Sequence, residues 1–169
     1  MRELKVVEIR VSTGEAPPVV VLAEVGGAER RLPIWMSHSG ASAIFSATEP
    51  PNAERPSIHD LAWRLAGSSS EPLSAIIITR FEDGQYYAEL VFGETVLPAR
   101  PSDAIAIALR AGRPIQCADE VLDAAGVSAA ELAEATEEAD EVPEDEVERF
   151  LEFLDSVTPE DFTGDEGKP

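Results

Sequence analysis

The chain has little of several features that would narrow its function. Its 169 residues include one cysteine, two histidines, two tryptophans and two tyrosines. Cys117 has no partner for an internal disulfide or a cysteine–histidine zinc site, and its apolar neighbours predict a buried thiol. The first apolar stretch is interrupted by charges, unlike the core of a signal peptide. No apolar run approaches the length of about 18 residues that a membrane span needs, so we expect a soluble, cytoplasmic protein without membrane contact.

Basic residues are also scarce, and most of the excess of acidic over basic residues lies in the C-terminal part of the chain. The chain has 13 basic and 33 acidic residues, a formal net charge of −20. Residues 1–118 hold 14 acidic and 11 basic side chains, whereas residues 119–169 hold 19 acidic and two basic ones. Such a tail repels phosphate backbones and favours a basic protein partner. The composition argues against tight binding of nucleic acid by the whole chain, and leaves room for a weak, local site on the body.

Apolar alternation and turn residues predict strands through most of the body. The strongest hairpin signal is Asp83–Gly84 between two alternating runs. The predicted strands cover 4–11, 19–25, 29–36, 74–81, 85–92, 95–99 and 115–118.

Capping residues predict helices between these strands. A short helix is predicted from Ser37 or Ser39 to about residue 47, and Ser57–Asp60 has the form of a capping box that opens a second helix. A third is expected after Pro101, with Ser102 as its N-cap and Gly112 just past its end. Further helices are predicted at 119–125 and 128–140, and residues 147–157 carry an apolar stripe at helical spacing.

A weak internal repeat supports an α+β fold. Residues 23–44 align with 88–109, and eight of the 22 pairs are identical. Both segments predict strand, turn, strand and capped helix, so we expect a duplicated β-β-α unit that forms one mixed, mainly antiparallel sheet with short helices packed on it. Residues 1–126 form the predicted body, and 127–169 a separate acidic, helical extension with a disordered end.

Polar residues gather at two predicted helix starts. His59 and Asp60 open one helix, and Arg100, Ser102 and Asp103 open another. Such a helix end can bind phosphate through its free N–H groups, with an arginine adding a bidentate contact. The same residues also serve as plain helix caps, and that alternative stays open. In the repeat alignment His38 lies opposite Asp103, so the two related helix starts could face one cleft.

Other polar and aromatic residues give weaker signals. Glu24 and Glu89 alternate with apolar neighbours and are expected to face solvent. The aromatic residues are scattered along the chain and form no base-stacking platform on one strand.

Four motifs together carry a family resemblance. They are Leu-Pro-Ile-Trp at 32–35, Arg-Pro followed by His-Asp-Leu at 55–61, Ala-Arg-Pro-Ser-Asp-Ala-Ile-Ala at 99–106, and Pro-Ile ahead of Glu-Val-Leu at 114–122. Over residues 1–126 the chain resembles the bifunctional nuclease domain family, whose members are credited with cleaving RNA and DNA. The resemblance implies an α+β duplication and a homo-oligomer, at least a dimer.

The family's recurrent polar positions fall on Arg55, His59, Asp60, Arg100, Ser102 and Asp103. The resemblance then implies His59, Asp60 and Asp103 as catalytic residues, with Arg55, Arg100 and Ser102 on substrate phosphate. Asp60 and Asp103 would hold Mg²⁺ or Mn²⁺, which prefers a few carboxylates plus phosphate oxygens.

Two departures from the family pattern bear on activity. Members usually carry Glu where this chain has Gly40, and Thr where it has Ile58. If that glutamate is a ligand or a base, the chain is weakened or inactive as a nuclease. The alternative function is therefore a non-catalytic, dimeric binding or regulatory module whose acidic tail engages a basic partner.

Overall fold

The computed structural model describes residues 1–11, 16–26, 30–68 and 71–140. The chain divides into two compact units, Met1–Ala129 and Ala130–Pro169. In the part described, no helix is long and apolar enough to cross a membrane. The second unit contains most of α5 (Ala129–Asp140), with Glu131 in its first turn. The apolar stripe predicted at 147–157 and the predicted disordered end lie outside the described residues.

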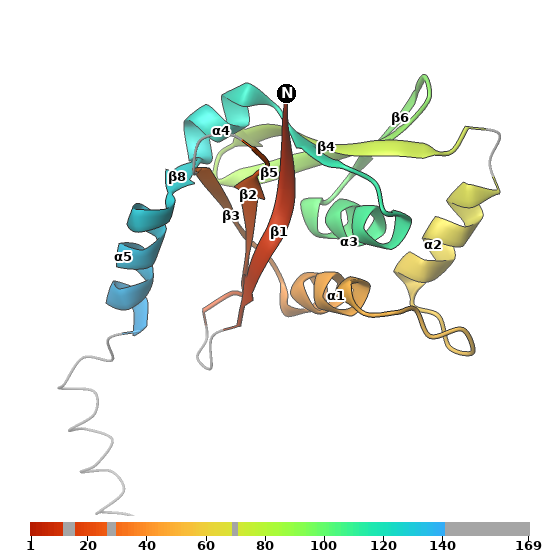
Figure 1. Cartoon of the computed structure of the whole chain (residues 1–169), viewed down its shortest axis with the longest axis horizontal. Coiled ribbons are helices and arrows are strands. Elements are labelled where there is room, and N and C mark those ends of the chain that lie inside the picture. The colour runs from red at the N-terminus through yellow and green to blue at the C-terminus, as the bar shows by residue number, and fades with distance from the viewer. Residues whose placement is uncertain (12–15, 27–29, 69–70, 141–169) are drawn as a thin grey trace, which may run out of the picture. The chain divides into compact units, whose positions relative to one another are not determined.

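A single eight-stranded sheet runs through the body (Figure 1). The strand order is β6-β5-β4-β7-β1-β2-β3-β8, and only β4 and β7 are parallel neighbours. The mixed, mainly antiparallel sheet with short helices confirms the predicted α+β class. The strands are β1 (Arg2–Arg10), β2 (Val19–Glu24), β3 (Arg30–Trp35), β4 (Leu73–Glu82), β5 (Gln85–Phe92), β6 (Thr95–Ala99), β7 (Ile115–Cys117) and β8 (Val127–Ser128).

Local sequence rules explain most of these strands. The hairpin between β4 and β5 turns at Asp83 and Gly84, whose φ angles of 51° and 76° suit a tight two-residue turn. The sheet's middle is apolar, and Cys117 on β7 is fully buried as predicted. Burial, followed by the nearby charge of Asp119, raises the pKa of the Cys117 thiol to about 12. Strand β8 was not predicted, because two residues are too short to show any periodicity.

Three helices pack together, and α3 is the one that contacts β4 and β5. Helix α3 (Pro101–Ala111) packs on these strands, and α1 (His38–Thr48) and α2 (Ile58–Gly67) pack against α3 (Figure 1). The short α4 (Asp119–Ala125) contacts β3 and β4. Ser37 caps α1, and Gly112 ends α3 in the left-handed conformation, as predicted. Both β-β-α segments have the expected element order, and their origin by duplication stays a prediction.

Two expectations about polar residues in the body are wrong. Helix α3 has Arg100, not Ser102, at its N-cap, because Pro101 has the fixed φ that suits the first helical position. Ser102 therefore lies inside the first turn, where it is buried. Glu24 is also buried rather than facing solvent, since Arg30 pairs with its carboxylate at 3.0 Å. A carboxylate on a buried strand is tolerated when a cation compensates its lost hydration.

Close packing of α1 on α3 depends on Gly40. A Cβ atom built at this position would lie 2.8 Å from Ser102 Cβ and 3.0 Å from Ser102 Oγ. Such an approach leaves no room for a side chain unless the helices shift. Where members of the resembled family usually carry Glu, this chain therefore has a glycine that permits a tight contact between α1 and α3.

We expect Gly40→Ala to lower the free energy of unfolding by about 1–3 kcal/mol, the usual cost of overpacking a tight contact. Gly67→Ala is the matched control, because a Cβ at the end of α2 meets nothing within 4 Å. Urea denaturation followed by circular dichroism would measure both variants. Equal stability of Gly40→Ala and the wild-type chain would contradict this account of the α1–α3 contact.

Candidate functional site

Three of the predicted site residues meet where α2 and α3 begin. His59 Nε2 lies 3.2 Å from Asp103 Oδ1. The guanidinium of Arg100 contacts the same carboxylate with two groups, Nε to Oδ2 at 2.7 Å and Nη2 to Oδ1 at 3.1 Å. We call these residues the His59–Asp103–Arg100 cluster. It joins two segments 41 to 44 residues apart in the chain, a contact that their spacing in the sequence could not establish.

The cluster keeps Asp103 ionised. Partial burial by itself raises the pKa of this carboxyl group, but the hydrogen bonds from Arg100 and His59 outweigh it, and the pKa falls below its ordinary value. The hydrogen bond to Asp103 in turn raises the pKa of the exposed Arg100 guanidinium. At neutral pH the cluster therefore contains a carboxylate with a fixed cation on one side and an imidazole on the other.

A capping box places His59 in the first turn of α2. The Ser57 backbone N–H and hydroxyl both donate to Asp60 Oδ2, at 2.9 and 2.8 Å. The backbone N–H of Asp60 donates to Ser57 Oγ at 3.2 Å, which completes the reciprocal arrangement. The capping box predicted from Ser57 to Asp60 is confirmed.

The second oxygen of Asp60 faces a buried arginine. Arg110 Nε lies 2.7 Å from Asp60 Oδ1, and the two atoms form an ion pair whose alignment falls short of a hydrogen bond. The other nitrogens of Arg110 donate to carbonyl oxygens at the end of α1, Nη2 to Ser46 at 2.8 Å and Nη1 to Glu49. One side chain near the end of α3 thus contacts both neighbouring helices.

Asp60 is engaged by the fold on both oxygens. It is 3% exposed. Burial pushes the pKa of its carboxyl group up, but the Ser57 hydrogen bonds and the charges of Arg110 and Arg64 bring the pKa below its usual value. This geometry matches the capping alternative, in which Asp60 positions its neighbour His59. Its catalytic or metal-binding role stays a prediction.

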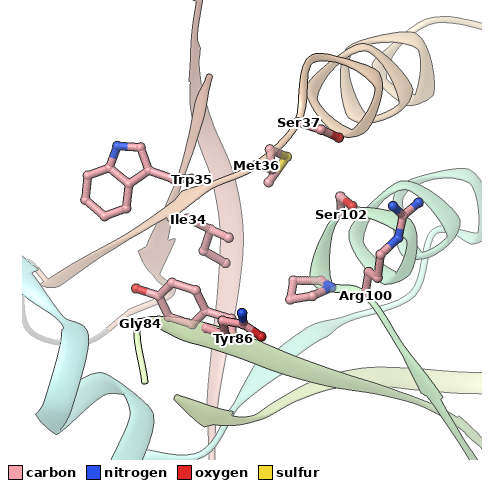
Figure 2. A pocket seen from close by; sticks show the side chains of 10 residues that line it. Ile34, Trp35, Met36, Ser37, Gly84, Tyr86, Arg100 and Ser102 are labelled. Atoms are coloured by element: carbon pink, nitrogen blue, oxygen red, sulfur yellow. The ribbon is translucent and has the colours of Figure 1, made fainter. Parts of the chain in front are cut away.

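Arg55 and Ser102 differ in accessibility. Arg55 is exposed in the loop before α2, and its guanidinium has no ion pair or hydrogen bond within the described ranges. Ser102 is buried in the first turn of α3, beside a hollow that the start of α1 also lines (Figure 2). The two related helix starts therefore do share a hollow. His38 is exposed, however, and it is His59 that meets Asp103.

The donor set does not fit a resident metal ion in this arrangement. Both oxygens of Asp103 contact cationic or imidazole nitrogens, and both oxygens of Asp60 face Ser57 or Arg110. Among the residues that the structure describes, no group of three His, Cys, Asp or Glu side chains is placed to hold a metal. Binding of Mg²⁺ or Mn²⁺ stays a prediction that the assay below tests.

Sequence reasoning missed Arg110 and the residues opposite α3 in the hollow. Arg110 lies seven residues after Asp103, and nothing in its local pattern indicates a partner on another helix. Gln85 and Tyr86 follow the hairpin turn, and the antiparallel pairing of β5 with β6, which places Ala88 opposite Ala99, brings them near Arg100. The one sequence feature that could have drawn attention to Tyr86 is its position just after the Asp83–Gly84 turn and Gln85.

We expect Asp60→Asn to lower the free energy of unfolding by about 3 kcal/mol at pH 7, because it leaves the Arg110 cation buried without its carboxylate. The folded-state pKa of Asp60 lies below its unfolded value of about 3.9, so wild-type protein has this stabilisation above about pH 4 and loses it as the pH falls through the folded-state pKa. The difference in unfolding free energy between Asp60→Asn and the wild-type chain should therefore become smaller at acidic pH.

Urea denaturation at pH 7 and pH 3 would measure this difference. Asp123→Asn is the matched control, since the Arg30–Asp123 pair at 3.1 Å is exposed on its acidic side and should contribute less than about 1 kcal/mol. A loss at pH 7 no larger for Asp60→Asn than for Asp123→Asn would contradict the structural role of the buried pair.

Comparison with known proteins places the chain in a family. The family model described as the bifunctional nuclease domain matches residues 20–130, which contain the whole cluster. Similar relatives are the uncharacterized proteins MT1877 and Rv1829 of Mycobacterium tuberculosis, from strains CDC 1551 / Oshkosh and ATCC 25618 / H37Rv. Each is 43% identical over 164 residues, which cover 96% of this chain and 98% of the relative. The chain belongs to the bifunctional nuclease domain family.

Proposed function

We propose that the chain is a nuclease that hydrolyses phosphodiester bonds of RNA and DNA at the His59–Asp103–Arg100 cluster. The observation that carries this proposal is the 3.2 Å contact between His59 Nε2 and Asp103 Oδ1, on a carboxylate that Arg100 also holds. Family membership supports the same reaction class.

In this proposal His59 moves the proton. Asp103, ionised at neutral pH, accepts a hydrogen bond from Nε2–H and so fixes the tautomer and orientation of the ring. The Nδ1 atom is then the basic nitrogen, free to take a proton from the attacking oxygen or, once protonated, to give one to the leaving oxygen. The His59 side chain is 18% exposed, so its surroundings hold the ring while part of it stays accessible to solvent.

Arg100 and Arg55 supply the positive charge that a phosphodiester needs. Arg100 is exposed and uses Nε and Nη2 on Asp103, so its Nη1 group is free among the described contacts to donate to a phosphate oxygen. Arg55 precedes His59 by four residues in an exposed loop. Stabilising the charge that develops on phosphate oxygens is a large part of catalysis in such sites.

The competing proposal is a binding module without catalysis. The observation that favours it is that each carboxylate oxygen of Asp60 and Asp103 already contacts a nitrogen or hydroxyl group of the protein. In that case the same arginines would bind nucleic acid, or the acidic tail would recruit a basic protein. The expected homo-oligomer also stays a prediction.

One cleavage assay on single-stranded RNA and DNA distinguishes the two proposed functions. His59→Ala and Asp103→Asn are expected to reduce cleavage at least about 100-fold, the usual scale for losing a general acid–base. His38→Ala is the matched control, because the chain's other histidine is exposed at the start of α1 and should leave the rate unchanged. All four proteins are purified in parallel, so that contaminating nuclease appears equally in each.

Mg²⁺, Mn²⁺ and chelator arms complete the design. Loss of cleavage with chelator would support metal assistance. Cleavage that persists with chelator and still requires His59 would support proton transfer by His59 without a metal. Equal cleavage by wild type and His59→Ala would contradict the proposed site. Binding of the strands without cleavage by any of the proteins would favour the binding module.

A further inference from the structure

Helix α2 leaves three large apolar side chains exposed. Its only buried residue is the charged Asp60, whereas α1, α3 and α4 all bury apolar side chains. Ile58, Leu61 and Leu65 are 71%, 42% and 72% exposed, and their spacing of three and four residues places them on one side of the helix. We call these three residues the α2 stripe.

A helix of this length depends on the packing of its apolar face. Isolated helices of ten residues are marginal in water, and in proteins most of their stability comes from burying that face. Contiguous apolar surface on a soluble protein, rimmed by polar residues, commonly marks an interaction site. The exposure of the α2 stripe among the described residues therefore indicates a docking surface.

An apolar groove of about 490 Å³ adjoins the α2 stripe. Ala62 lines this groove and follows Ile58 by four residues, so it lies one turn along the same side of α2. We call this cavity the α2 groove. Its apolar lining comes from α2, α3, β5 and β6 and consists of Ala62, Ala66, Leu90, Phe92, Leu97 and Ile107.

The α2 groove extends the apolar surface to the edge of the sheet. Strand β6 is the outermost strand, and its Leu97 pairs with Leu90 of β5 (Figure 1). Leu97 lines the groove and is 47% exposed. Pro98 follows it and has no N–H group to donate, which makes the edge a poor template for strand pairing. A partner on this face would therefore dock through side chains rather than by extending the sheet.

Charge around the α2 groove is of both signs, unlike the charge of the whole chain. Arg64 is exposed on α2, and Glu71 lines the groove. The net charge of −20 lies mostly after residue 118, so a basic partner would be drawn to that region rather than to this face. A second copy of the chain offers the same two charges in reversed order, because a twofold axis turns a surface onto itself.

The shape of the face also suits a second copy. The α2 groove has small side chains, Ala62 and Ala66, on its α2 wall, whereas Ile58 and Leu65 of the α2 stripe are the most exposed side chains of the helix. A surface with a ridge beside a groove can match itself in a twofold arrangement, since each ridge then meets the groove of the other copy.

We propose that the α2 stripe and the α2 groove form a twofold interface between two copies of this chain. Each α2 stripe lies in the α2 groove of the other copy, which removes Ile58, Leu61 and Leu65 of both copies from water. Arg64 of one copy faces Glu71 of the other at the rim. The inference is independent of the proposed function, because no stripe residue belongs to the His59–Asp103–Arg100 cluster.

Sedimentation of the full chain over a wide range of concentration tests the interface. We expect a dimer that Leu65→Glu weakens at least about tenfold, since the variant buries an unpaired charge in the contact. The substitution is at a side chain 72% exposed in the single chain, so its circular dichroism should match the wild type. Phe45→Glu is the matched control, because Phe45 is 57% exposed on α1 and lies outside the α2 groove.

Salt gives a second readout of the same equilibrium. Two chains that each carry a net charge of −20 repel each other, and salt screens that repulsion but not an apolar contact. The dimer should therefore become tighter as the salt concentration rises. A dimer that dissociates in high salt would contradict an interface built mainly on apolar side chains.

Cross-linking locates the contact without relying on a disruptive charge. Cys117 is buried, and burial raises the pKa of its thiol to about 12, so it is protected from maleimides at neutral pH. An introduced surface thiol is then the reactive one. We expect a short bis-maleimide to join two copies of Leu65→Cys, and to leave Phe45→Cys as single chains.

Three results would overturn the interface. The first is a wild-type chain that sediments as a monomer at every concentration, which would assign the α2 face to a different molecule. The second is a dimer equally tight in Leu65→Glu and Phe45→Glu, or cross-linked equally through positions 65 and 45, which would place the contact elsewhere. The third is a trimer or larger assembly, because a twofold contact closes with two copies.

Discussion

The buried ion pair between Arg110 and Asp60 is the constraint on which the candidate site depends. Arg110 extends from near the end of α3 to the carboxylate of α2 and to the last carbonyl groups of α1, so one guanidinium joins three helices. Because Asp60 also completes the capping box of α2, its position fixes the first turn of that helix. His59 is the neighbouring residue, and it is thereby held against Asp103 on the same helix that carries Arg110. A buried pair is not in itself strong evidence of stability, but losing one partner is costly, and here it would release the site as well.

The curvature of the sheet is the second requirement. In strand order, β3 and β5 are separated by β4, β7, β1 and β2, yet a hydrogen bond from Tyr86 reaches the carbonyl of Pro33. Figure 1 shows β1 to β3 running across β4 and β5 rather than alongside them. This curvature brings the end of β3 to the start of α3, and the hollow beside Arg100 follows from it. The His59–Asp103–Arg100 cluster and the hollow thus come from two different features, helix pairing and sheet curvature, and both include Arg100.

The distribution of charge fits a site of limited affinity. Within the body two cations at the cluster are paired with carboxylates, Arg100 with Asp103 and Arg110 with Asp60, while the surplus of acidic residues follows residue 118. For the proposed nuclease, this balance of charge allows only weak, local attraction to a phosphate backbone.

The sequence by itself determined the local structure: the Asp83–Gly84 hairpin, the capping box of α2 and the burial of Cys117 follow from short-range rules that need no tertiary partner. It also indicated His59, Arg100 and Asp103, because their motifs resemble those of a known family. The tertiary structure alone decided that Asp60 is buried against Arg110, that Ser102 lies inside a turn rather than capping it, and that Tyr86 faces the hollow. The physical reason is that ion pairs between helices and contacts across a curved sheet depend on how elements pack, and residues far apart in the chain carry no local sign of their future neighbours.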